Sequence, residues 1–69
     1  MRYKKGDEVI YTYNRTYDDH RSLLKRPIGI VDEEWDMRDI PMLGCNWTTK
    51  DGETFYWNVP KSYTKLINK

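Results

Sequence analysis

The sequence predicts an all-β fold in which five short strands wrap into one small barrel-like sheet. The stretch 42–67 carries most of this prediction, because it reads as strand, tight turn, strand, short helical turn and strand. Upstream, two further runs of β-branched and aromatic residues lie on either side of a long polar segment. The 69 residues make a single domain, residues 1–69, whose thin core leaves room for homo-oligomerisation or a partner to add stability.

The first strand is expected over residues 8–13, after a turn at residues 5–7. Its residues are mostly β-branched or aromatic, which suits a half-buried strand. Because side chains alternate along a strand, Val9, Tyr11 and Tyr13 are expected to share one face.

The polar segment 14–26 shows no strand alternation and is long for a loop in a compact domain. Loops of this length often carry function. Within it, residues 18–25 are expected to form one or two helical turns, with Leu23 and Leu24 folding back onto the sheet.

The second strand is expected over residues 27–31, entered through Pro27. Gly29 within it marks either a bulge or a close crossing of another chain segment. Residues 32–39 are expected to form an acidic loop, with five acids and one arginine around Trp35. Two placements of this indole stay open: tucked under the loop, or exposed as an anchor for a basic partner.

Residues 42–48 and 54–58 are expected to form a hairpin around Asp51-Gly52, since glycine accepts the positive φ of a tight turn. Of two competing registers, the one with a three-residue loop is predicted, because it places apolar residues opposite one another. One face then carries Leu43, Cys45, Trp47, Phe55, Trp57 and Val59. A single 3₁₀ turn over 59–63 and a closing strand over 63–67 complete the sheet.

The sequence lacks the residues that several functional classes require. Cys45 is the only cysteine and falls on the predicted core face, so we expect a buried thiol, no disulfide framework and no cysteine-based zinc site. His20 is the only histidine, and with Asp18 and Asp19 it makes an incomplete ligand set, so no metal and no cofactor are expected. No nucleophile-base arrangement can be assembled, and the protein is predicted not to be an enzyme. No apolar run approaches the roughly 20 residues of a membrane span, so a soluble, cytoplasmic protein is predicted.

Several short motifs resemble those of small SH3-like barrels. Residues 59–66 (VPKSYTKL) resemble the end of an SH3 domain, where a Pro-x-x-Tyr turn precedes the last strand. Residues 6–9 (GDEV) and 29–31 (GIV) resemble the opening of KOW-type and Mind-bomb/HERC-type barrels, and Asn46-Trp47 before Asp51-Gly52 resembles the Mind-bomb Trp-x-x-Gly hairpin. The chain also resembles small accessory proteins of bacteriophages in being short, rich in tyrosine and tryptophan, and mixed in charge. The resemblance implies a five-stranded SH3-like barrel with a long first loop and a 3₁₀ turn before the last strand.

The SH3 resemblance implies a protein-interaction module. It places Pro60 and Tyr63 in a groove for proline-rich or extended peptides, with Tyr11, Tyr13 or Trp35 as further aromatic walls. The Ala-Leu-Tyr-Asp-Tyr segment and the adjacent tryptophan pair of SH3 domains are absent, so the usual PxxP ligand is not implied. The net charge of +1 favours a protein or peptide partner over nucleic acid.

The alternative is a nucleic-acid module that uses the basic segment 14–26. Phosphate contact would come from four cations and base stacking from one ring. These residues are Arg15, Arg21, Lys25, Arg26 and Tyr17. A KOW-like chain of this kind implies contact with RNA, the ribosome or RNA polymerase.

Overall fold

The computed structural model describes residues 3–16 and 20–67 and confirms an all-β chain. The strands are β1 (Glu8–Tyr11), β2 (Ile28–Met37), β3 (Ile40–Thr48), β4 (Thr54–Pro60) and β5 (Thr64–Leu66). Two short 3₁₀ helices, η1 (Arg21–Lys25) and η2 (Lys61–Tyr63), join them. No helix in the described part of the chain has the length and apolar character needed to cross a membrane.

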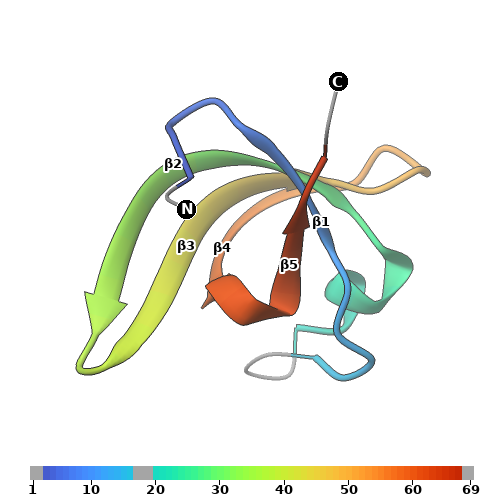
Figure 1. Cartoon of the computed structure of the whole chain (residues 1–69). Coiled ribbons are helices and arrows are strands. Elements are labelled where there is room, and N and C mark those ends of the chain that lie inside the picture. The colour runs from blue at the N-terminus through green and yellow to red at the C-terminus, as the bar shows by residue number, and fades with distance from the viewer. Residues whose placement is uncertain (1–2, 17–19, 68–69) are drawn as a thin grey trace.

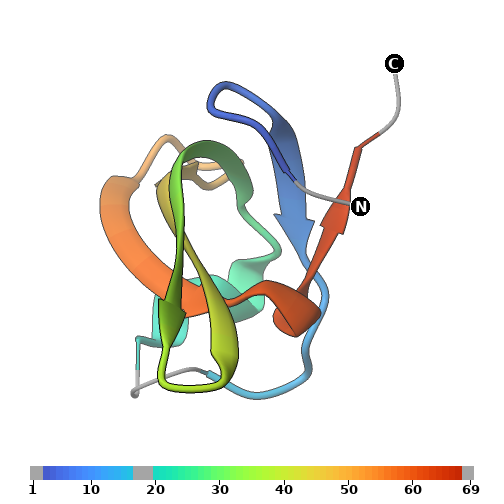
Figure 2. The ribbon, with the colours of Figure 1, turned by 60° about the vertical axis from the view of Figure 1, so that its left-hand side comes forward.

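All five strands belong to one antiparallel sheet in the order β4-β3-β2-β1-β5 (Figure 1). The strands β2, β3 and β4 follow one another as a meander, and β5 returns to pair with the far side of β1. Figure 2 shows how the sheet curves around its interior, with η2 beside the β2–β3 hairpin and β5 beyond it next to β1. Across residues 3–16 and 20–67 the outer strands β4 and β5 form no ladder with each other, so the expected closure into a barrel is not confirmed.

The β3–β4 hairpin has the predicted register. Trp47 lies opposite Phe55 and Cys45 opposite Trp57. Gly52 has a φ of 91°, and the backbone N–H of Thr49 donates to the carbonyl of Glu53 over 2.9 Å, which closes the three-residue loop. Aromatic and apolar packing therefore decides this register, as expected.

The prediction of an acidic loop over 32–39 is wrong. β2 continues through these acids to Met37 and pairs with β3 up to a two-residue turn at Arg38 and Asp39. The register shifts between Val31 and Glu33, so a bulge at this point resets which side chains face the core. The acidic segment is therefore the far end of a long two-stranded ribbon.

Gly29 marks neither the predicted bulge nor a crossing of backbones, but the close approach of a side chain from the neighbouring strand β3. A Cβ atom placed there would lie 2.7 Å from ring carbons of Trp47. This glycine therefore lets the largest core side chain lie flat against β2.

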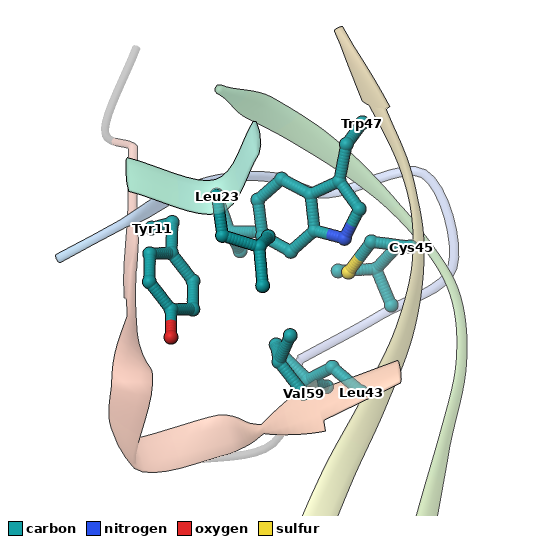
Figure 3. Packing of buried hydrophobic residues seen from close by; sticks show 8 residues of the cluster. Tyr11, Leu23, Leu43, Cys45, Trp47 and Val59 are labelled. Carbon is teal, nitrogen blue, oxygen red and sulfur yellow. The ribbon is translucent and has the colours of Figure 1, made fainter. Parts of the chain in front are cut away.

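The core is built around Trp47, whose indole N–H donates to the carbonyl of Trp57 over 3.1 Å. Figure 3 shows Tyr11 and Leu23 directed toward this ring from β1 and η1. The Tyr11 and Trp47 rings meet edge-on with centroids 6.1 Å apart. Leu23 is fully buried while Leu24 is 46% exposed, so only the first of the two leucines expected to fold back does so. The other members of the cluster are Val9, Val31, Leu43, Cys45 and Val59.

Candidate functional site

The most prominent aromatic surface lies where the chain leaving β1 meets η2. The rings of Tyr13 and Tyr63 stack there with centroids 3.9 Å apart and planes 6° from parallel. Tyr63 also meets the buried Tyr11 ring edge-on at 6.2 Å. We call the stacked pair Tyr13 and Tyr63 the tyrosine surface. Its outer ring, Tyr13, is 37% exposed, and its inner ring rests on the core.

Backbone and side-chain hydrogen bonds hold the tyrosine surface in place. The backbone N–H and the hydroxyl of Thr12 both donate to the carbonyl of Tyr63, over 2.8 and 3.1 Å. The Arg26 guanidinium donates to the carbonyls of Tyr11 and Tyr13. The segment before Tyr13 is therefore fixed at two points, which lowers the entropy lost when a ligand binds.

A half-buried ion pair lies beside η2. The ammonium of Lys61 is 3.0 Å from a carboxylate oxygen of Glu34 and 4.8 Å from the centre of the Tyr3 ring. No role was predicted for Tyr3, because most residues around it before the turn at Gly6 are polar. The Tyr3 ring packs against the core, and the one signal for this in the sequence is an aromatic residue just before the turn at Gly6.

Three of the five predicted groove residues, Tyr11, Trp35 and Pro60, lie outside the tyrosine surface. Tyr11 is fully buried and its hydroxyl donates to the carbonyl of Arg15 over 2.7 Å, so it supports the tyrosine surface from below and cannot be a wall. Trp35 is half-buried, and its indole N–H donates to the side-chain carbonyl of Asn58 over 3.0 Å. The indole is thus tucked against β4 rather than presented to a partner.

Pro60, the last predicted groove residue, is buried at the end of β4. It shares a cross-strand row with Met42 and Trp35 on the face opposite the core. The structure therefore brings Tyr13 and Tyr63 together, and leaves the other three groove candidates as supporting residues.

The predicted basic cluster is only partly assembled. Lys25 lies 3.3 Å from a carboxylate oxygen of Asp51 and 3.5 Å from one of Glu53. The hydrogen bond to Asp51 is the main cause of the raised pKa of Lys25. Arg26 points its guanidinium at backbone carbonyls, as described above. These two cations are therefore engaged within the protein.

Arg15 and Arg21 remain exposed, and Tyr17 lies outside the described residues. The hydroxyl of Ser22 donates to the carboxylate of Glu53 over 2.8 Å, which adds to the ties between η1 and the β3–β4 loop. The end of the long basic segment is therefore anchored on the sheet.

His20 and Cys45 both lie in packed surroundings that suit a structural role. The imidazole stacks on Phe55 with centroids 4.3 Å apart and meets Trp57 edge-on at 4.6 Å. Burial raises the pKa of the Cys45 thiol to about 12, with a smaller contribution from Asp32, so the reactive thiolate is disfavoured. No group of three metal-ligating side chains is found among residues 3–16 and 20–67.

The tyrosine surface offers flat, amphipathic rings with hydroxyl groups. Such a surface can stack on, or pack against, the side chains of a ligand and can hydrogen-bond its backbone. No family model matches the chain, and comparisons with curated proteins and with solved structures give no match either.

Proposed function

We propose that this protein is a non-enzymatic interaction module that binds an extended segment of a partner protein at the tyrosine surface. The observation that carries the proposal is the stacked pair of Tyr13 and Tyr63, with one ring on the core and the other exposed. Tyrosine is among the residues that dominate binding energy at protein interfaces. It supplies a large contact area with few rotatable bonds, so little freedom is lost on binding.

The environment of the pair supports the same proposal. The Thr12 and Arg26 hydrogen bonds hold the exposed ring before any ligand arrives. A surface held in this way keeps more of its contact energy as affinity than a flexible loop would.

We also propose that the sheet has the architecture of an SH3-like barrel. The strand order β4-β3-β2-β1-β5 and the Pro60–Tyr63 turn are what a small SH3-like barrel would have. In that fold an extended peptide lies between the first loop and the 3₁₀ turn, which is where Tyr13 and Tyr63 meet. Among the described residues β4 and β5 do not pair with each other, so the proposed barrel rests on the strand order and on the turn before β5.

The test compares two exposed tyrosines on different parts of the surface. Tyr13 is 37% exposed and Tyr56, on the opposite face of the sheet, is 41% exposed. Partners are captured from a lysate on immobilised protein, and peptides from the captured partner are titrated by NMR against the Tyr13→Ala and Tyr56→Ala variants. We expect Tyr13→Ala to weaken peptide binding roughly tenfold or more, with shift changes centred on Thr12 and Tyr63, and Tyr56→Ala to bind as the unmodified protein does. Equal binding by both variants, in proteins with unchanged circular dichroism, would reject the tyrosine surface.

A nucleic-acid function has less support, because two of its four proposed cations are engaged within the protein. It would rest on Arg15 and Arg21, both exposed. A titration of tryptophan fluorescence with a mixed-sequence oligonucleotide at low and moderate salt examines it. A saturable change that weakens steeply with salt, and that an Arg15→Ala, Arg21→Ala double variant abolishes, would favour nucleic acid over the peptide proposal.

A further inference from the structure

A shallow groove of about 500 Å³ lies on the outer face of the sheet, at the end of the β2–β3 ribbon where β2 begins. Its lining includes Ile10 and Ile28, which pair across β1 and β2, and two cations, Lys50 and Arg26, of which Arg26 already donates to the carbonyls of Tyr11 and Tyr13. We call it the basic groove, and its lining is Ile10, Arg26, Ile28, Thr48, Thr49 and Lys50. Lys50 forms no ion pair with any described residue, so its charge is available to an outside group.

The opposite end of the same ribbon has the complementary chemistry. Met37 and Ile40 pair across the final turn, and they are 38% and 47% exposed. Asp36 and Asp39 flank them and are exposed. We call residues 36–40 the acidic tip. Within the tip, the two acids Asp36 and Asp39 are accompanied by one cation, Arg38, so its net charge is −1.

Geometry prevents the tip from filling the groove of its own chain. Ile28 begins the β2–β3 ladder and Met37 ends it, so the two surfaces lie about 30 Å apart along a strand that rises roughly 3.3 Å per residue. Figures 1 and 2 show the hairpin projecting away from the rest of the sheet. A groove and a tip that match in chemistry but cannot meet within one chain can meet between two chains.

We propose that the acidic tip of one copy docks into the basic groove of a second copy. Met37 and Ile40 would cover Ile10 and Ile28, and the carboxylates of Asp36 and Asp39 would face the ammonium of Lys50. The contact joins different surfaces of the two copies, so it is heterologous and propagates as an open chain or a ring rather than as a closed two-fold dimer. A tip of five residues buries less area than a standard interface, so the association is weak, concentration-dependent and sensitive to salt.

The experiment uses one variant that disables each surface. Ile28→Asp places a carboxylate in the groove, and Met37→Asp removes the apolar part of the tip. Sedimentation velocity over a concentration series should show association of the unmodified protein and a monomer for each variant alone. An equimolar mixture of the two variants should form a one-to-one heterodimer and nothing larger, because each retains one working surface. Leu24→Asp is the matched control, since it places the same charge at an exposed leucine of η1 and should associate as the unmodified protein does.

Three results would overturn the proposal: a monomeric unmodified protein at every concentration, a variant that associates normally, or a mixture that stays monomeric. Circular dichroism confirms folding of each variant. If either variant fails to fold, Lys50→Glu and Asp39→Lys replace the pair. Each should be monomeric alone when dilute. Their opposed charges in the double variant should restore association, and failure to restore it would reject the docking.

Discussion

Truncating Leu23 gives the sharpest test of how the long first loop joins the fold. This side chain is fully buried against the Tyr11 and Trp47 rings although it comes from a short 3₁₀ helix in a polar segment. Replacing a buried leucine by alanine costs about 2–5 kcal/mol, because transfer energy is lost and a cavity remains. A 69-residue domain has a total stability of roughly 3–10 kcal/mol. The Leu23→Ala variant should therefore lose a large share of its free energy of unfolding.

The neighbouring Leu24 is the matched control, since it is 46% exposed on the same helix. Leu24→Ala should change stability by no more than about 0.5 kcal/mol. Urea and thermal denaturation of the two variants measure the difference. At roughly 4–8 °C per kcal/mol for a domain of this size, Leu23→Ala should lower Tm by 10 °C or more as an order-of-magnitude estimate. Equal melting of the two variants would show that η1 is not part of the core, and that the long loop folds separately from the sheet.

Three further substitutions test local features of the backbone and the charges. Gly29→Ala should cost about 1–3 kcal/mol in urea denaturation, because its Cβ would meet the Trp47 ring at 2.7 Å. Arg38→Gly should raise stability by up to about 1 kcal/mol, because Arg38 has a φ of 58° that glycine adopts freely; an unchanged or lower Tm would contradict this. Hydrogen bonding from Thr49, then the neighbouring ammonium, holds the pKa of Asp51 below its usual 3.8. A carboxyl group whose pKa is lowered by folding stabilises the folded state at pH values above its unfolded pKa, and this stabilisation is lost as the pH falls through the folded pKa. Asp51→Asn should therefore lose less stability below about pH 4, in acid titrations followed by circular dichroism.

The β3–β4 hairpin could be predicted because local and cross-strand preferences agree. Asp51-Gly52 supplies the turn, and only one register places Trp47 opposite Phe55. The 3₁₀ turn at η2 could also be predicted, from Pro60 and the residues after it.

The acidic half of β2 could not be predicted, because nothing local indicates a strand there. Its charged residues have low strand preference, and its turn at Arg38 and Asp39 lacks the glycine that normally marks a tight hairpin. The bulge after Val31 also breaks the alternation, so Trp35 and Met37 fall out of phase with the earlier part of the strand.

Only part of the arrangement at the candidate site could be predicted, because local patterns do not reveal where the chain turns or which distant residues pair. Alternation placed Tyr11 and Tyr13 on one face, but β1 ends at Tyr11, and the chain then turns so that one ring enters the core and the other stays outside. The partners of Lys25 lie 26 and 28 residues further along the chain. No local pattern reveals pairings at that distance, so the basic segment looked more available than it is.

The two proposed surfaces can act independently, and the reason lies in how the β2–β3 ribbon is held. On one side Lys61 pairs with Glu34, and on the other Asn58 accepts the indole N–H of Trp35. Both contacts tie the middle of the ribbon to the end of β4 and to η2, so the tip beyond them projects from a supported base. Substituting the exposed Met37 leaves both ties intact, and of the groove-lining residues Arg26 is the one that also donates to the tyrosine surface, at the carbonyl of Tyr13. Met37→Asp should therefore abolish self-association while preserving partner capture, and Tyr13→Ala should do the reverse. Joint loss of both properties in either variant would mean that the ribbon and the tyrosine surface form one binding site instead of two.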